Sequence, residues 1–206
     1  MMPAGLQDDP PVNETRNRFE YRAFAADFGL VEPRLRELGG TPLIRESAEI
    51  YLVAAGRGDQ NIKIRADQLD IKQLLAERDG FQQWGPLGKW SFPLPPDALA
   101  ALSAALGLDT TLPESSGQAV NSLVGHFNAS RELVIVDLFK RRFGFEVGDC
   151  QAEVAEVTIN GAALKTACVE STELDQARRL IDRLGLVAYA NTSYIEALMR
   201  VTGLVR

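Results

Sequence analysis

Residues 18–22, Arg-Phe-Glu-Tyr-Arg, constrain the fold most, because charged and apolar side chains alternate there without exception. Successive side chains of a β-strand point to opposite faces, so Phe19 and Tyr21 face one way and the three charged side chains face the other. The same alternation recurs at residues 62–65 and near residues 140–142. These charged faces either meet water, as on the outside of an open sheet, or turn inward toward a common ligand.

Turn signals divide the chain into about eight strands, with helices early, in the middle and late. Strands are expected at residues 16–24, 42–54, 61–66, 68–75, 81–92, 132–145 with an interruption at Gly144, 151–159 and 164–171. Helices are expected from Asp27 to Leu38 and at residues 95–106, 118–127, 173–184 and 193–201. The strongest hairpin signal is Asn160-Gly161. Strands joined by short turns predict an antiparallel α+β fold, and eight of them can close into a barrel, or tunnel, with flanking helices.

Composition and charge narrow the class of protein. The chain has 206 residues and a net charge of −6, which argues against a nucleic-acid-binding surface. No apolar run approaches the ~20 residues that cross a bilayer, and the N-terminus lacks the apolar core of a signal peptide. We therefore expect a cytoplasmic protein without a membrane partner, in which residues 1–15 form a disordered lead-in and residues 16–206 a single domain. With His126 as the only histidine, a histidine triad is effectively excluded, and Cys150 and Cys168 are expected to be reduced and buried.

Cations predominate at the alternating strand positions, although the protein as a whole is acidic. The cations are Arg18, Arg22, Lys63, Arg65, Lys72, Lys140 and Arg142, and the carboxylates are Glu20, Glu153, Glu156 and Glu170. Outer faces of sheets usually mix both signs to limit repulsion. The excess of one sign favours a polyanionic ligand, with a solvated outer face as the alternative.

These motifs resemble those of the CYTH domain, the family of triphosphate tunnel metalloenzymes that includes class IV adenylyl cyclases, thiamine triphosphatases and tripolyphosphatases. The resemblance covers about residues 18–186. Residues 18–22 match the opening Glu-x-Glu-x-Lys strand, Lys63-Ile64-Arg65 a basic-x-Arg pair, Lys72 the lysine of the next strand, residues 140–142 a second basic pair, and residues 167–170 a final Val-Glu-x-Glu strand.

The resemblance implies an eight-stranded antiparallel tunnel in which basic side chains hold a triphosphate and carboxylates hold Mg²⁺ or Mn²⁺. The phosphate-binding residues would be Arg22, Lys63, Arg65, Lys72, Lys140 and Arg142. The metal ligands would be Glu20, Glu156 and Glu170, and no residue is assigned a catalytic role. Arginine holds phosphate through paired N–H donors, lysine acts as a point charge, and Mg²⁺ needs carboxylate anchors.

Three positions depart from the family pattern. Arg18 stands where relatives have the first glutamate of the opening motif, Arg22 where they have lysine, and Cys168 where they have a glutamate. Two carboxylates of a two-metal site are thus replaced. Glu153 and Glu156 cannot share one face of a regular strand, so only one of them points inward unless a bulge intervenes.

The resemblance favours metal-dependent hydrolysis of an inorganic or organic triphosphate. The alternatives are a module that binds a polyphosphate or phosphorylated ligand without turnover, a class IV-type adenylyl cyclase, and a structural barrel with internally paired charges. Relatives are often dimers, which makes a homodimer a further expectation.

Overall fold

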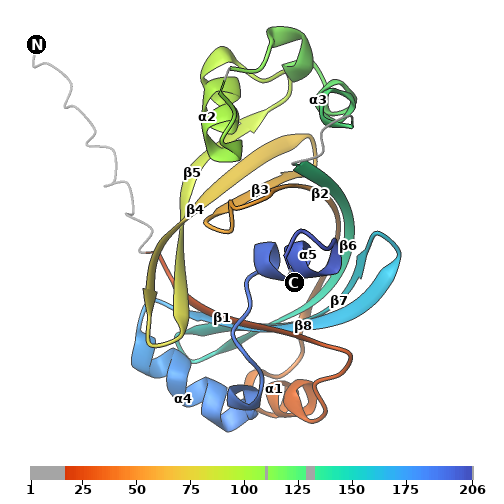
Figure 1. The fold of residues 1–206 in the computed structure, drawn as a ribbon. Helices are drawn as coiled ribbons and strands as arrows, with labels where there is room; N and C mark the ends of the chain where they lie inside the picture. Colours follow the sequence, from red (N-terminus) through yellow and green to blue (C-terminus); the bar gives the residue numbers. More distant parts are fainter. Residues whose placement is uncertain (1–16, 110, 129–132, 206) are drawn as a thin grey trace, which may run out of the picture.

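The computed structural model describes residues 17–109, 111–128 and 133–205. Eight antiparallel strands close into a barrel in the order β1-β5-β4-β3-β2-β6-β7-β8 (Figure 1). The strands are β1 (Phe19–Ala25), β2 (Leu43–Ala54), β3 (Gln60–Arg65), β4 (Gln68–Arg78), β5 (Phe81–Ser91), β6 (Leu133–Val147), β7 (Cys150–Ile159) and β8 (Ala162–Ser171). The α+β fold with an eight-stranded antiparallel barrel is thereby confirmed, while the expected lead-in at residues 1–15 lies outside the described residues.

The turn chemistry of the sequence accounts for much of this topology. Asn160 and Gly161 join β7 to β8 with φ values of 45° and 88°, and two successive positive φ values are what a type I′ hairpin turn requires. The expected interruption of β6 at Gly144 is wrong. Gly144 pairs with Leu43 on one side and Glu153 on the other, and the strand continues to Val147.

Four helices lie outside the barrel in two groups (Figure 1). The helices are α1 (Val31–Gly39) and α4 (Leu174–Leu184) on one side, and α2 (Pro96–Leu106) and α3 (Val120–Phe127), preceded by the 3₁₀ turn η1 (Glu114–Gly117), on the other. Helix α1 begins later than the predicted Asp27, because the Asp27 side chain accepts a hydrogen bond from the Gly29 N–H and closes a turn ahead of the helix. No helix in the described part of the chain is long and apolar enough to span a membrane.

The fifth helix, α5 (Tyr194–Val201), lies within the ring of strands (Figure 1) and follows the short 3₁₀ turn η2 (Leu186–Ala188). Ser193 caps α5 in a capping box with Glu196, which fixes where the helix begins. Its apolar side chains pack against inward-facing residues of β2, β6 and β7. This internal cluster includes Tyr51, Val53, Val136, Leu138, Ala155, Val157, Ile159, Ile195, Leu198 and Met199. Helix α5 therefore fills one end of the barrel and leaves the remainder of the interior to the charged residues.

Candidate functional site: a charged cavity inside the barrel

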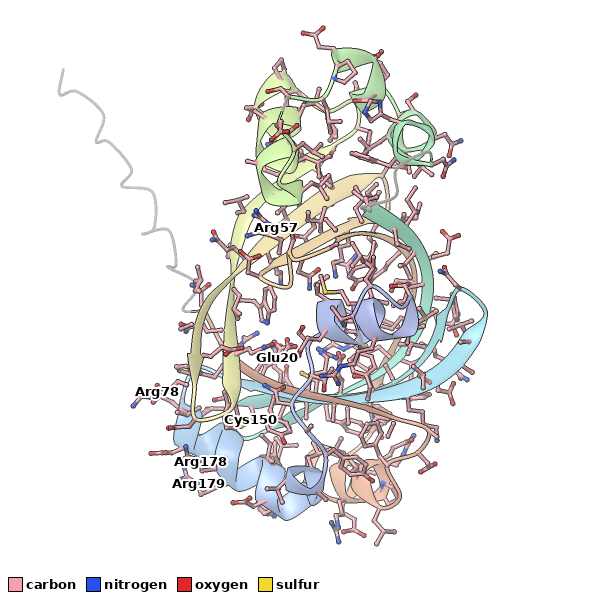
Figure 2. The ribbon with its side chains drawn as sticks, in the orientation of Figure 1. Glu20, Arg57, Arg78, Cys150, Arg178 and Arg179 are labelled. Atoms are coloured by element: carbon pink, nitrogen blue, oxygen red, sulfur yellow. The ribbon has the colours of Figure 1, made fainter. Side chains whose placement is uncertain are left out.

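The interior beyond α5 is a cavity of about 470 Å³ lined by charged side chains of every strand except β5, which contributes Trp84. Glu20 and Arg22 of β1 both face it, and Figure 2 shows Glu20 inside the ring of strands. Most of the charged side chains at the alternating strand positions thus turn inward. The cations that line the cavity are Arg22, Arg45, Lys63, Arg65, Lys72, Lys140 and Arg142, and the carboxylates are Glu20, Glu46, Glu49, Asp70, Glu153 and Glu170. The structure brings together all the cations expected to bind phosphate and adds Arg45, which the sequence analysis missed.

Glu156 does not take the inward position that was expected of a metal ligand, because its side chain points away from the cavity. Its side chain is 55% exposed and lies 3.9 Å from Arg141 Nη1 on the outer face. Strands β7 and β8 pair without a register shift, so residues an odd number apart on β7 face opposite sides. Glu153, whose side chain is 5% exposed, takes the inward position instead.

Glu153 is the centre of a buried ion cluster. Its Oε1 atom lies 2.8 Å from Arg22 Nη1 and 2.8 Å from Lys140 Nζ, and its Oε2 atom lies 2.5 Å from Arg142 Nε. Burial alone would raise the pKa of Glu153, but these three cations together hold it well below its usual range. Glu153 is therefore charged and fully engaged, and it fixes three of the cations in place.

Tyr194 of α5 connects this cluster to the closed end of the barrel. The Arg22 guanidinium lies 4.6 Å from the centre of the Tyr194 ring, and Lys140 Nζ lies 5.3 Å from it. Cations over an aromatic face are stabilised by the ring quadrupole, most strongly where water is excluded. Ser193 and Tyr194 thus form the floor of the cavity beneath two of the cations.

A second ion cluster surrounds Glu49 of β2, a residue that the sequence analysis did not single out. Lys63 Nζ lies 3.5 Å from its carboxylate and Arg65 Nη1 lies 3.4 Å from it, while the hydroxyls of Ser47 and Tyr51 donate hydrogen bonds of 3.0 Å. Burial opposes the charge of Glu49, but the cations and hydroxyls around it lower its pKa. The period-two spacing of Arg45, Ser47 and Glu49 was the available signal, since all three lie on the inner face of one strand.

Replacement of this carboxylate gives a pH-dependent prediction. Because the pKa of Glu49 is lower in the folded protein than its ordinary value of 4.5, its contribution to stability is complete above that pH and is lost as the pH falls through the folded-state pKa. Glu49→Gln should therefore lower the free energy of unfolding near neutral pH, and its difference from wild type should shrink below pH 4.5. Urea unfolding of both proteins across this range measures the difference, with Glu156→Gln, which alters an exposed carboxylate outside the cavity, as control. A difference that stays constant with pH contradicts the assignment.

The third cluster combines Glu20, Cys168 and Glu170, whose donor atoms all lie within 4.8 Å of one another. Glu20 and Glu170 are direct neighbours across β1 and β8. Arg22 contacts both, with its Nε atom 2.9 Å from Glu20 and its Nη2 atom 3.9 Å from Glu170. Burial, followed by repulsion from Glu20, raises the pKa of Glu170 in spite of Arg22, so a further cation beside this pair would favour its charged form.

The donor set fits one divalent cation held by two carboxylates. Oxygen ligands suit Mg²⁺ and Mn²⁺, and Mg²⁺ usually takes one or two carboxylates and completes its shell with water and substrate phosphates. Cys168 is a soft donor, and burial raises the pKa of its thiol, which keeps it protonated. Glu20 and Glu170 are thus the residues that would hold the ion. Cys150 and Cys168 are both buried free thiols, as expected.

Arg18 lies outside this cluster. It is exposed, and its Nη1 atom donates a 2.9 Å hydrogen bond to Gln151 Oε1. Arg18, which stands where the resemblance led us to expect a carboxylate, is therefore not among the residues that line the cavity. Two of the cations that line the cavity, Arg45 and Lys72, have no carboxylate at ion-pair distance among the described residues, whereas the other lining cations are paired.

Comparison with known proteins defines the fold. No family model and no curated protein matches the sequence. Similar solved structures include PH1012 from Pyrococcus horikoshii OT3, with a TM-score of 0.52 and 15% identity over 87% of this chain and 98% of that one. The conserved hypothetical protein Pfu-838710-001 from Pyrococcus furiosus gives a TM-score of 0.50 and 13% identity over 87% of this chain and 98% of that one. The Hippeastrum protein HpAC1, described as having a dominant triphosphatase activity, gives a TM-score of 0.49 and 12% identity over 92% of this chain and 97% of that one. The chain has the barrel fold that its resemblance to CYTH domains implied, and at these identities the fold is what is shared.

Proposed function

We propose that the protein binds a triphosphate-containing substrate inside the barrel and hydrolyses it with the help of a divalent cation. The observation that carries this proposal is the convergence of cations from β1, β2, β3, β4 and β6 on one cavity, beside a pair of inward carboxylates. A triphosphate carries several negative charges and many acceptor oxygens. An enclosed site with pre-positioned cations matches both properties.

The cations of the cavity divide into those that are paired with a carboxylate and those that are not, and the two groups have different tasks. Arg22, Lys140 and Arg142 are fixed by Glu153, while Lys63 and Arg65 are fixed by Glu49. Because these side chains are ordered before a ligand arrives, less entropy is lost on binding. The cations without a paired carboxylate, Arg45 and Lys72, add net positive charge to the cavity and attract the anion.

Glu20 and Glu170 would anchor the divalent cation at the edge of this cationic surface. Such an ion, when bound, neutralises phosphate charge and lowers the pKa of coordinated water. Helix α5 closes the cavity behind the cations, and exclusion of bulk water strengthens every charge interaction inside. The chain's own residues thus bind, orient and shield the phosphates.

Binding without turnover is the second candidate, favoured by one specific observation. Arg22 already contacts both carboxylates of the metal cluster, and Cys168 supplies a neutral thiol where a third oxygen ligand would strengthen the site. A guanidinium in this position competes with a divalent cation for the same two carboxylates.

Thermal melts and phosphate-release assays with tripolyphosphate, ATP and thiamine triphosphate, each with Mg²⁺, Mn²⁺ or EDTA, distinguish these functions. The expected result is a rise in melting temperature with the anion and phosphate release only with the metal. Stabilisation without release at any metal concentration would assign the binding module, and cyclic AMP formed from ATP would assign the cyclase. No stabilisation and no release with any of the three compounds would refute a triphosphate site.

A further inference from the structure

The charged cavity has a mouth at the end opposite to α5. A second cavity of about 410 Å³ adjoins it there and shares three lining residues with it, namely Arg45, Arg142 and Gln151. Along β2 the order is Arg45, Glu49, Tyr51 and Val53, with Val53 packed in the internal cluster that contains α5. A ligand that enters the main cavity from this mouth therefore passes the two arginines first.

The arginines at the mouth form an arrangement that is unfavourable without an anion. Arg45 and Arg142 are direct cross-strand neighbours on β2 and β6, and both face the interior. Like charges placed directly opposite one another destabilise a sheet. Glu153 balances Arg142, but no described carboxylate lies at ion-pair distance from Arg45. Arg18 approaches the same place through its hydrogen bond to Gln151.

We propose that this mouth is a second anion site, which holds the phosphates of a linear polyphosphate that extend beyond the three in the main cavity. The inference rests on the proposed function, because it assumes that a triphosphate unit occupies the main cavity. It also gives a role to Arg18, which stands where the family resemblance expects a carboxylate and donates a hydrogen bond to Gln151, one of the residues that the two cavities share.

The lining of the second cavity favours a phosphate chain over a nucleoside. Apart from the shared residues it consists of Gly39, Thr41, Leu43, Gly144, Phe145 and Glu146. The only aromatic ring among them, Phe145, is buried in the outer core between the barrel and α1 and α4. Bases are usually held by stacking on aromatic faces, and this mouth offers none. Glu146 is the one carboxylate among the residues that line this second cavity, and it is exposed to water.

The test compares affinities for tripolyphosphate and long-chain polyphosphate by competition binding in EDTA, with concentrations expressed per chain end. Wild type should bind the long chain more tightly. Arg45→Gln should reduce the ratio of the two affinities by roughly fivefold, the effect of one partly exposed charge pair. Glu146→Gln should increase the ratio, because it removes the opposing charge. Arg141→Gln alters an outward-facing arginine of β6, the strand that pairs with β2 beside Arg45; it is the matched control and should leave the ratio unchanged.

The outcomes separate this inference from the proposed function. If tripolyphosphate and the long chain bind equally, or if Arg45→Gln and Arg141→Gln change the ratio alike, the second site is refuted while the triphosphate site stands. A 5′-triphosphorylated oligonucleotide that binds more tightly than long-chain polyphosphate would also refute it. If tripolyphosphate itself does not bind, the proposed function fails, and the inference fails with it.

Discussion

Glu153→Gln is expected to destabilise the protein by about 3–5 kcal/mol, the usual cost of removing one partner from a buried ion cluster. The substitution keeps the size and shape of the side chain but leaves Arg22, Lys140 and Arg142 around a neutral amide. Their mutual repulsion then acts in an interior where charges are poorly screened. Urea unfolding at neutral pH measures the loss.

Glu156→Gln is the matched control for this substitution. It lies on the same strand and makes the same chemical change, but its side chain is 55% exposed and its ion pair with Arg141, at 3.9 Å, is open to water, so a change within about 0.5 kcal/mol is expected. Tripolyphosphate should restore stability to Glu153→Gln by a larger increment than it adds to wild type, because the anion replaces the missing negative charge. Equal stability of the two variants would show that Glu153 does not hold the cations together.

The barrel could be predicted because its determinants are local in the sequence. Strict alternation at residues 18–22 fixed which side chains share a face, and Asn160-Gly161 fixed the hairpin between β7 and β8. The prediction that the charged faces point inward was based on the excess of cations and on the resemblance to CYTH domains. Alternation alone does not distinguish the inside of a closed sheet from the outside of an open one.

The ion pairing inside the barrel could not be predicted, because it depends on contacts between strands that are distant in sequence. Glu153 and Glu156 were equivalent candidates until the register between β7 and β8 was known. Arg45 and Glu49 lie on a strand whose other residues are largely apolar, and their role is evident only when β3 and β6 lie beside β2. The placement of α5 inside the barrel was likewise hidden, since its apolar face suits an outer surface equally well.

The pairing of charges also changes the expected character of the cavity. The sequence predicted an excess of cations on these faces, whereas the structure shows most of the cations paired with Glu49 and Glu153. A paired interior is tolerable in the empty protein, and the ligand then competes with internal carboxylates for the same donors. Arg45 and Lys72, which have no such competitor among the described residues, should therefore contribute most to the net attraction for an anion.

Glu170→Gln is expected to lower metal-dependent phosphate release by about 10²–10³-fold, the range seen when one preorganised electrostatic group is removed from a catalytic site. Glu170 is one of two carboxylates that can hold the cation, and Glu20 alone remains tied to Arg22 at 2.9 Å. Tripolyphosphate binding in EDTA should be retained or tightened, because a negative charge leaves the cavity.

Two further variants are controls for Glu170→Gln. Cys168→Ser should change Mg²⁺-supported release little, since the protonated thiol is not expected to be a ligand. Glu156→Gln controls for loss of a carboxylate elsewhere on the barrel. Full activity in Glu170→Gln would exclude the Glu20–Glu170 pair as the metal site, whereas equal loss of binding and release would indicate that the residue positions the phosphates instead.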